Sequence, residues 1–195
     1  MTKQQITAIA VSAVIALALG IATGFYAKRW FQGQDAAERR ETAEVARPDS
    51  LPKFVLYDLD GNEVSKDDLL ANDKALFINF WATWCKPCRE EMPLLSEMQE
   101  KYSDRLLMVG IAIDNKEAVV GFLEQLGGVD YPILLGKQEL DAIETANDMG
   151  IELIGLPISL TTDRSGKIVR IHTGEVDEAE VTALIEEAVQ ANARD

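Results

Sequence analysis

The feature of this sequence that most constrains its fold is the apolar run KALFINFWA at residues 74–82, which leads directly to Cys85 and Cys88. A run with so few polar residues is typical of a strand that is covered on both faces. A helix is expected to follow over residues 86–101. The run therefore predicts an α/β domain in which the cysteine pair lies where a central strand passes into a helix.

Strand-like and helix-like segments alternate along the rest of the chain, and this alternation indicates a layered α/β domain. In chain order we expect a hairpin over 54–64 that turns at Asp60-Gly61-Asn62, a strand over 106–114, a helix over 116–127, a strand over 131–136, a helix over 138–150 and a hairpin over 157–174. Gly127 is expected to end its helix. A last helix should begin at Asp177 and Glu180, which have the spacing of a capping box.

The N-terminal segment is of a different kind, because residues 6–27 carry no charge. A helix needs about 20 apolar residues to cross a bilayer. A cleaved signal peptide has a shorter apolar region, of about 7–15 residues. Cleavage after Ala16-Leu17-Ala18 would also leave an apolar new terminus. We therefore expect an uncleaved membrane anchor within residues 1–30.

The anchor is followed by residues 31–50, whose mixed charge and lack of an apolar face predict a juxtamembrane linker. The globular domain is then expected over residues 51–195, which is long enough to bury a core of its own. Lys3 and the terminal amine precede the anchor, whereas Lys28, Arg29, Arg39 and Arg40 follow it. By the positive-inside rule this slightly favours a cytoplasmic domain.

Two properties of the whole chain narrow the functional classes. The net charge of −14 argues against nucleic-acid binding, because a phosphate-binding protein needs a basic face that releases counterions. The only two cysteines are so close in sequence that closing the loop between them gains little from chain entropy. The pair is therefore not expected to be structural.

The position of the cysteine pair predicts thiol–disulfide exchange. The free amides and dipole of a helix N-terminus stabilise a thiolate on Cys85, and a Cys-x-x-Cys motif lowers the thiol pKa. Cys88 follows one turn later on the same face, at a spacing that permits a disulfide. Cys85 is expected to be the exposed nucleophile and Cys88 the shielded resolving thiol. Pro87 suits the first turn, and Pro93 should kink the helix.

Metal binding is the alternative chemistry for these thiols. A closed zinc site needs four ligands, and the chain offers two cysteines and the single histidine His172. A copper site formed by Cys85, Cys88 and His172 stays open, and it would make the protein a membrane-tethered copper-delivery module. Otherwise we expect His172 to be a solvated residue near the end of a strand.

The segment FINFWATWCKPCREEMPLL, residues 77–95, resembles the active-site segment of the thioredoxin superfamily. More narrowly, it resembles that of the membrane-anchored TlpA/ResA-type thiol–disulfide reductases, over about residues 50–190. The resemblance implies a thioredoxin-like fold, with a central mixed sheet flanked by helices. It also implies a redox-active disulfide without a further cofactor. Such proteins face the periplasm or the outer surface of the cell membrane, so the resemblance favours the bacterial inner membrane with a periplasmic domain, against the charge count.

The resemblance extends to individual residues. Trp84, Cys85, Pro87 and Cys88 match the active site of the family, and Pro93 matches its helix-kinking proline. The matched residues beside the cysteines are expected to contact substrate.

A second matching segment is GIELIGLPISL, residues 150–160, which resembles the segment that carries the cis-proline of the superfamily. That proline would be Pro157, and the backbone of Leu156 would then face Cys85 and pair with an extended substrate peptide. The family often has two threonines after this proline. Ile158 and Ser159 stand here instead, so we expect a different substrate-facing surface.

Two positions near the cysteines distinguish this chain from thioredoxins. Asn79 replaces the aspartate that thioredoxins bury, and it cannot take up a proton. In the TlpA/ResA group a glutamate three residues after the second cysteine is associated with the site, and here it is Glu91. Glu91 would accept the proton of Cys88. The alternative is that Glu90 and Glu91 are both solvated in an early helical turn.

Together these features predict a thiol–disulfide oxidoreductase that reduces disulfides in extracytoplasmic proteins. The resemblance implies a link to cytochrome c maturation. Expected partners are protein thiols or disulfides, such as apocytochrome c or a copper-site assembly protein. A membrane electron donor is expected to reduce the protein again.

Overall fold

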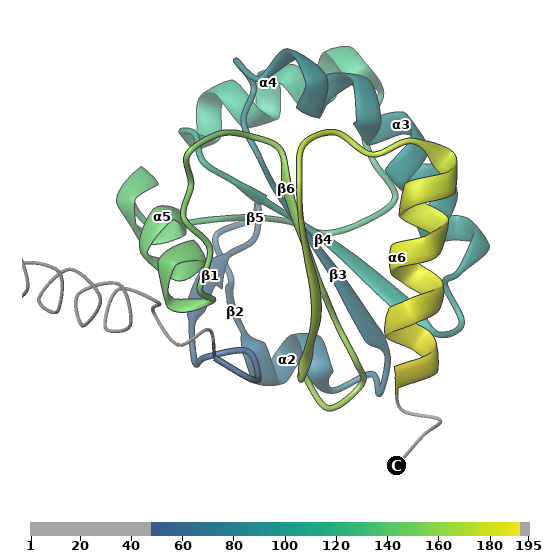
Figure 1. Cartoon of the computed structure of the whole chain (residues 1–195). Helices are drawn as coiled ribbons and strands as arrows, with labels where there is room; N and C mark the ends of the chain where they lie inside the picture. Colours follow the sequence, from purple (N-terminus) through teal and green to yellow (C-terminus); the bar gives the residue numbers. More distant parts are fainter. Residues whose placement is uncertain (1–47, 192–195) are drawn as a thin grey trace, which may run out of the picture. The chain divides into compact units, whose positions relative to one another are not determined.

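The computed structural model describes residues 48–191, in which seven strands form one sheet with the order β2-β1-β5-β4-β3-β6-β7 (Figure 1). Strands β3, β4 and β5 are parallel, whereas β6, β7, β1 and β2 join antiparallel, so the sheet is mixed. The strands are β1 (Val55–Tyr57), β2 (Glu63–Ser65), β3 (Ala75–Trp81), β4 (Leu106–Ala112), β5 (Ile133–Leu135), β6 (Ile158–Thr162) and β7 (Ile168–Thr173). The expected thioredoxin-like α/β fold is confirmed.

Helices cover both faces of this sheet (Figure 1). They are α2 (Lys66–Leu70), α3 (Lys86–Lys101), α4 (Lys116–Leu126), α5 (Glu139–Asp148) and α6 (Glu178–Ala191). Buried side chains of α3, α4 and α6 form one hydrophobic cluster with one face of the sheet. Those of α2 and α5 form a second cluster on the other face. The sheet is therefore the middle layer of three.

The predicted membrane span, residues 6–27, lies outside the described residues, as does most of the predicted linker. Within residues 48–191, no helix is long and apolar enough to cross a membrane.

Strand β3 has a strand on each side and helices over each face, so all seven of its residues are buried. Phe77 and Trp81 belong to the cluster beneath α3 and α6. Ile78 and Phe80 alternate with them and belong to the cluster beneath α2 and α5. The near-continuous apolar run is thus explained by cover on both faces, as expected from the sequence.

Helix α3 has the bounds expected from the sequence, residues 86–101. Its buried Gln99 holds it against β4, where the Gln99 Oε1 accepts from the backbone N–H of Met108 at 2.6 Å. The Gln99 Nε2 donates to the carbonyl of Leu106 at 3.4 Å. These bonds satisfy buried backbone groups that would otherwise lack partners, and they fix the helix that carries both cysteines.

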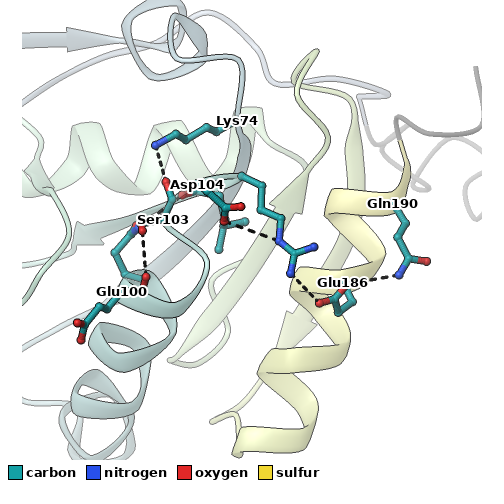
Figure 2. Close-up of polar contacts among 9 residues, drawn as sticks. Lys74, Glu100, Ser103, Asp104, Glu186 and Gln190 are labelled. Atoms are coloured by element: carbon teal, nitrogen blue, oxygen red, sulfur yellow. Dashed lines mark hydrogen bonds and ion pairs between the residues drawn. The ribbon is translucent and has the colours of Figure 1, made fainter.

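Polar contacts also join the C-terminal end of α3 to its surroundings, as Figure 2 shows. Lys74 Nζ donates to the carbonyl of Ser103 at 2.6 Å. Arg105 pairs with Glu186 of α6 at 3.3 Å. Because exposed ion pairs of this kind stabilise little, the buried contacts hold the helix more firmly than these do.

Two helix ends follow the chemistry expected from the sequence. Gly127 ends α4 in the left-handed region, at a φ of 91° that favours glycine. At the start of α6, the N–H of Glu180 donates to Asp177 Oδ1 at 2.8 Å, and the N–H of Asp177 donates to Glu180 Oε2 at 3.2 Å. This reciprocal pair is the predicted capping box.

The short helix α2 is an element that the sequence analysis did not predict. Ser65 caps it, and the backbone N–H of Ser65 donates to Asp68 Oδ2 at 2.8 Å. Its five residues are too few to show a helical period, so only the capping pair could have indicated it.

Candidate active site

The cysteine pair lies just beyond the carboxyl end of β3, where Cys85 caps the N-terminus of α3. A disulfide joins Cys85 to Cys88, whose Cα atoms are 5.3 Å apart. The backbone N–H of Cys88 donates to the Cys85 Sγ at 3.3 Å. A free amide at the start of the helix therefore points at this sulfur, and it would stabilise a thiolate there.

The exposure of the two cysteines corrects one expectation. Cys85 is 5% exposed and Cys88 is 0% exposed, so Cys85 is the more accessible but is not an exposed residue. The reason is the tight turn before α3, in which the N–H of Cys85 donates to the carbonyl of Ala82 at 3.1 Å. This turn folds Cys85 into the hydrophobic cluster with Trp81. A reacting sulfur must therefore approach from a narrow range of directions.

Trp84 and Pro87 flank the disulfide and present different surfaces. Trp84 is 69% exposed, whereas Pro87 is half-buried. The turn that carries Trp84 is anchored by Thr83, whose backbone N–H donates to Asp114 Oδ2 at 3.1 Å and whose hydroxyl donates to the same oxygen. Asp114 follows β4, and its contribution was not predicted, because it depends on which strands are neighbours.

The peptide bond between Leu156 and Pro157 is cis, as the resemblance implies. Ile158 pairs with Phe80 in the sheet, so the loop before β6 lies at the same end of β3 as the disulfide. Pro157 is buried and Leu156 is half-buried. The structure thus brings both residues to the site, while pairing of the Leu156 backbone with substrate stays a prediction.

Glu91 is buried, with 4% of its surface exposed, although it is a carboxylic acid. Its Oε1 accepts from Asn79 Nδ2 at 2.8 Å, and its Oε2 accepts from the backbone N–H of Val176 at 3.0 Å. The solvated alternative is therefore wrong for Glu91, since this position of the helix faces the sheet. It is right for Glu90, which is exposed and pairs with Lys86 at 2.6 Å.

Burial raises the pKa of Glu91 from 4.5 to about 7. The hydrogen bonds from Val176 and Asn79 lower this pKa, and the charge of Glu175 raises it, but both effects are smaller than that of burial. An acid whose pKa is close to the working pH can both accept and donate a proton. Glu91 lies one helical turn beyond Cys88, and is suited to exchange a proton with it.

Asn79 is held by more than its bond to Glu91. Its Nδ2 also donates to the hydroxyl of Ser159 on β6 at 3.2 Å, and both side chains are buried. In the sequence, Ser159 stands out only as a departure from the family pattern. Val176 was not predicted, because a backbone donor in the loop after β7 gives no signal in the sequence.

His172 does not join the cysteines in a metal site. It lies near the end of β7, is half-buried, and its Nε2 is 3.4 Å from the carbonyl oxygen of Glu175. Within residues 48–191, no group of three or more His, Cys, Asp or Glu side chains could hold a metal ion. The structure therefore gives no support to the copper-delivery hypothesis.

Comparisons with known proteins agree with this geometry. Residues 46–185 match the family model described as Redoxin. The chain is 34% identical over 171 residues to the thiol-disulfide oxidoreductase ResA of Bacillus thuringiensis strain Al Hakam, covering 83% of this chain and 86% of the relative. It is 32% identical to the thioredoxin-like protein YneN of Bacillus subtilis, covering 67% and 73%.

A solved structure shows the same likeness. The thioredoxin-family thiol:disulfide interchange protein of Chlorobium tepidum matches with a TM-score of 0.62 and 30% identity, covering 74% of this chain and 98% of that one.

The buried Glu91 should make stability depend on pH. An acid with a higher pKa in the folded than in the unfolded state binds more protons when folded, so stability falls as pH rises. The window runs from 4.5 to about 7. We expect the free energy of unfolding of the oxidised protein, relative to Glu91→Gln, to fall by about 2–3 kcal/mol between pH 5 and 8. Urea denaturation at several pH values measures it.

The matched control is Glu90→Gln, which removes an exposed carboxylate from the same turn of α3. Parallel stability curves for the wild type and Glu91→Gln across this pH range would contradict the assignment.

Proposed function

The chain belongs to the redoxin family and is a thiol–disulfide oxidoreductase of the ResA type, and we propose that it works as a reductase of disulfides in extracytoplasmic proteins. The observation that supports this direction is the buried carboxyl group of Glu91 beside the cysteines. A thiol pair is strongly oxidising when its reduced form is stabilised. A carboxylate near the thiols destabilises their thiolates and so favours the disulfide form of the protein.

The charges around the disulfide agree with a reducing pair. Lys86, next to Cys85, pairs with Glu90 at 2.6 Å, so its charge is partly neutralised. Glu175 adds a negative charge that acts on Glu91. The helix N-terminus is then the main group that stabilises the Cys85 thiolate, while the surrounding carboxylates oppose it.

The reaction proceeds in two exchanges. The Cys85 thiolate attacks a substrate disulfide, a mixed disulfide forms, and one substrate sulfur leaves as a thiolate. The Cys88 thiol then gives its proton to Glu91 and attacks the Cys85 Sγ. The Cys85–Cys88 disulfide forms and the second substrate sulfur is released. The substrate gains two electrons and the protein dithiol loses two.

The substrate-binding surface in this proposal consists of Trp84, Pro87, Leu156 and Pro157. These residues come from the turn before α3, from its first turn and from the loop before β6. Trp84 offers a large aromatic side chain and is 69% exposed. An unfolded or extended protein segment suits such a surface, because the narrow approach to Cys85 admits a single strand more readily than a folded face.

For the location, we propose a single-pass protein of the bacterial inner membrane that is anchored by residues 6–27, with the domain in the periplasm. An uncharged run of this length supports the anchor. The periplasmic side is supported by the resemblance to membrane-anchored reductases. A membrane electron donor would restore the dithiol, and apocytochrome c or a copper-site assembly protein would be the substrate.

The order of the two exchanges predicts which variant is trapped. Cys88→Ser should accumulate a covalent mixed disulfide with substrate through Cys85, because nothing resolves it. Cys85→Ser should form none, because Cys88 is fully buried.

In the chain with both cysteines, Glu91→Gln should slow resolution of the mixed disulfide about 10²-fold, since general-base assistance contributes about 10²–10⁴-fold. Non-reducing electrophoresis of quenched samples measures each species.

Glu90→Gln is the control for resolution, and it should resolve at the wild-type rate. Trapping through Cys88 in the Cys85→Ser variant would reverse the roles of the two cysteines.

The direction of the reaction is tested by the reduction potential of the Cys85–Cys88 pair. We expect a value near that of thioredoxin, about −270 mV, because the nearby carboxylates disfavour the thiolates. Glu91→Gln should raise the potential, whereas Glu90→Gln should change it less. Equilibration with glutathione or dithiothreitol buffers gives the value. A potential near about −120 mV would make the protein an oxidant instead.

The location is tested with reporters fused after Asp195. A reporter that is active only in the periplasm should give signal, and one that is active only in the cytoplasm should not. The reverse pattern would show that the basic residues after the anchor decide the orientation.

A further inference from the structure

Three buried polar atoms near Glu91 have no role in the mechanism above. Among the side chains of residues 48–191, Asn79 Oδ1, Trp81 Nε1 and the hydroxyl of Tyr131 are buried and lack a hydrogen-bond partner within the protein. Thr161 Oγ1, on β6, is the fourth such atom in this part of the chain. A buried polar group without a partner is destabilising, so native proteins rarely leave several together. Of the first three, Asn79 and Trp81 both belong to β3, and Tyr131 belongs to the segment leading into β5.

The sheet brings these three groups together. Asn79 on β3 lies beside Gly110 on β4, and strands in a sheet are about 4.8 Å apart. A β-carbon on residue 110 would lie 3.1 Å from Trp81 Nε1 and 3.2 Å from the Tyr131 Cε2. Glycine therefore lets both rings pack onto β4 at the position that pairs with Asn79.

Tyr131 also lines a cavity. It forms part of the wall of a cavity of about 710 Å³ between the end of α4, the segment before β5 and the turn that follows β1. Burial and, to a smaller extent, the charge of Glu91 raise the pKa of Tyr131. Tyr131 thus lines the cavity while its hydroxyl stays buried.

The hydrogen-bonding capacity of the three groups is complementary. The Nδ2 of Asn79 is already used by Glu91 and Ser159, so its Oδ1 needs a donor. The indole N–H of Trp81 can only donate, and the hydroxyl of Tyr131 can donate and accept. A water molecule can accept from the indole, donate to the amide oxygen and exchange a bond with the hydroxyl, which gives it the two to four partners that buried waters have.

We propose that Tyr131 is a positioning residue for Glu91. Tyr131 acts through a buried water that is held by Asn79 Oδ1, Trp81 Nε1 and the Tyr131 hydroxyl. The water fixes the amide of Asn79 so that Nδ2, and not Oδ1, faces the carboxylate. With Oδ1 turned toward Glu91, the carboxylate would lose a donor and face a negative dipole. The inference rests on the proposed function for the use of Glu91 as a base, but the arrangement itself is independent of turnover.

Other titratable residues stand on the elements around Glu91. Glu175, in the loop after β7, acts on it by charge. Cys88 lies one turn earlier on α3, and His172 stands on β7 opposite Ser159. In the oxidised protein the cysteines do not titrate, so the titration of Glu91 reports on its burial, on its hydrogen bonds and on the charge of Glu175.

The test uses the full-length oxidised chain with ¹³C-labelled glutamate carboxyl groups, in which the Glu91 signal is assigned by its loss in Glu91→Gln. Tyr131→Phe should raise the pKa of Glu91 by about 0.5–1 pH unit, because the water then keeps two of its three partners and holds the Asn79 donor less firmly. Tyr57→Phe is the matched control, since it removes a tyrosine hydroxyl whose contact, with Glu63 on β2, is exposed. An unchanged Glu91 pKa in Tyr131→Phe would overturn the proposal.

A second measurement needs no variant that could misfold. In the wild-type chain, the indole N–H of Trp81 should show a through-space NMR signal to a long-lived water, whereas that of Trp84, which is 69% exposed, should show only rapidly exchanging solvent. Absence of the Trp81 signal would also overturn the proposal. Both measurements are made without substrate, so they can fail while reductase activity stands, and the reductase can fail while they succeed.

Discussion

The hydrogen bond from Asn79 to Glu91, 2.8 Å long, joins the central strand to the helix that carries both cysteines, and the rest of the site is arranged around it. An aspartate at position 79 would place a second carboxylate beside the first, and one of the two would have to stay protonated. An amide instead offers a donor without a charge. With asparagine at position 79, Glu91 is the one member of this pair that titrates, and its protonation follows the surrounding pH.

Burying Glu91 lowers the stability of the fold but provides the carboxyl group for the proposed proton transfer from Cys88. A carboxylate at a buried position resists ionisation, and at neutral pH its folded state bears a free-energy penalty that grows with pH. Two donors limit that penalty, namely the amide of Asn79 and the backbone N–H of Val176. The fully buried strand β3 and the two hydrophobic clusters on its faces offset what remains, which allows the fold to keep a group that a purely structural core would exclude.

Much of the fold follows from local pattern, and much of the site does not. The apolar run predicted β3, and its junction with the cysteines predicted α3 with the bounds that the structure has. The five-residue α2 has no period to detect. The burial of Glu91 depends on Val176, which is 85 residues away in sequence, so helical spacing alone left two interpretations open. Cys85 is less exposed than expected, because the turn before α3 packs it into the core.

The same helix imposes opposite electrostatic conditions on its two sulfurs. Cys85 stands at the N-terminus, where the N–H of Cys88 points at its sulfur, and this favours a thiolate. Cys88 is fully buried, with Glu91 one turn beyond it, and both features favour the neutral thiol. Environments that push two pKa values apart assign distinct roles to chemically identical groups. In the proposed mechanism, Cys85 therefore attacks the substrate first, and Cys88 resolves the mixed disulfide once Glu91 takes up its proton.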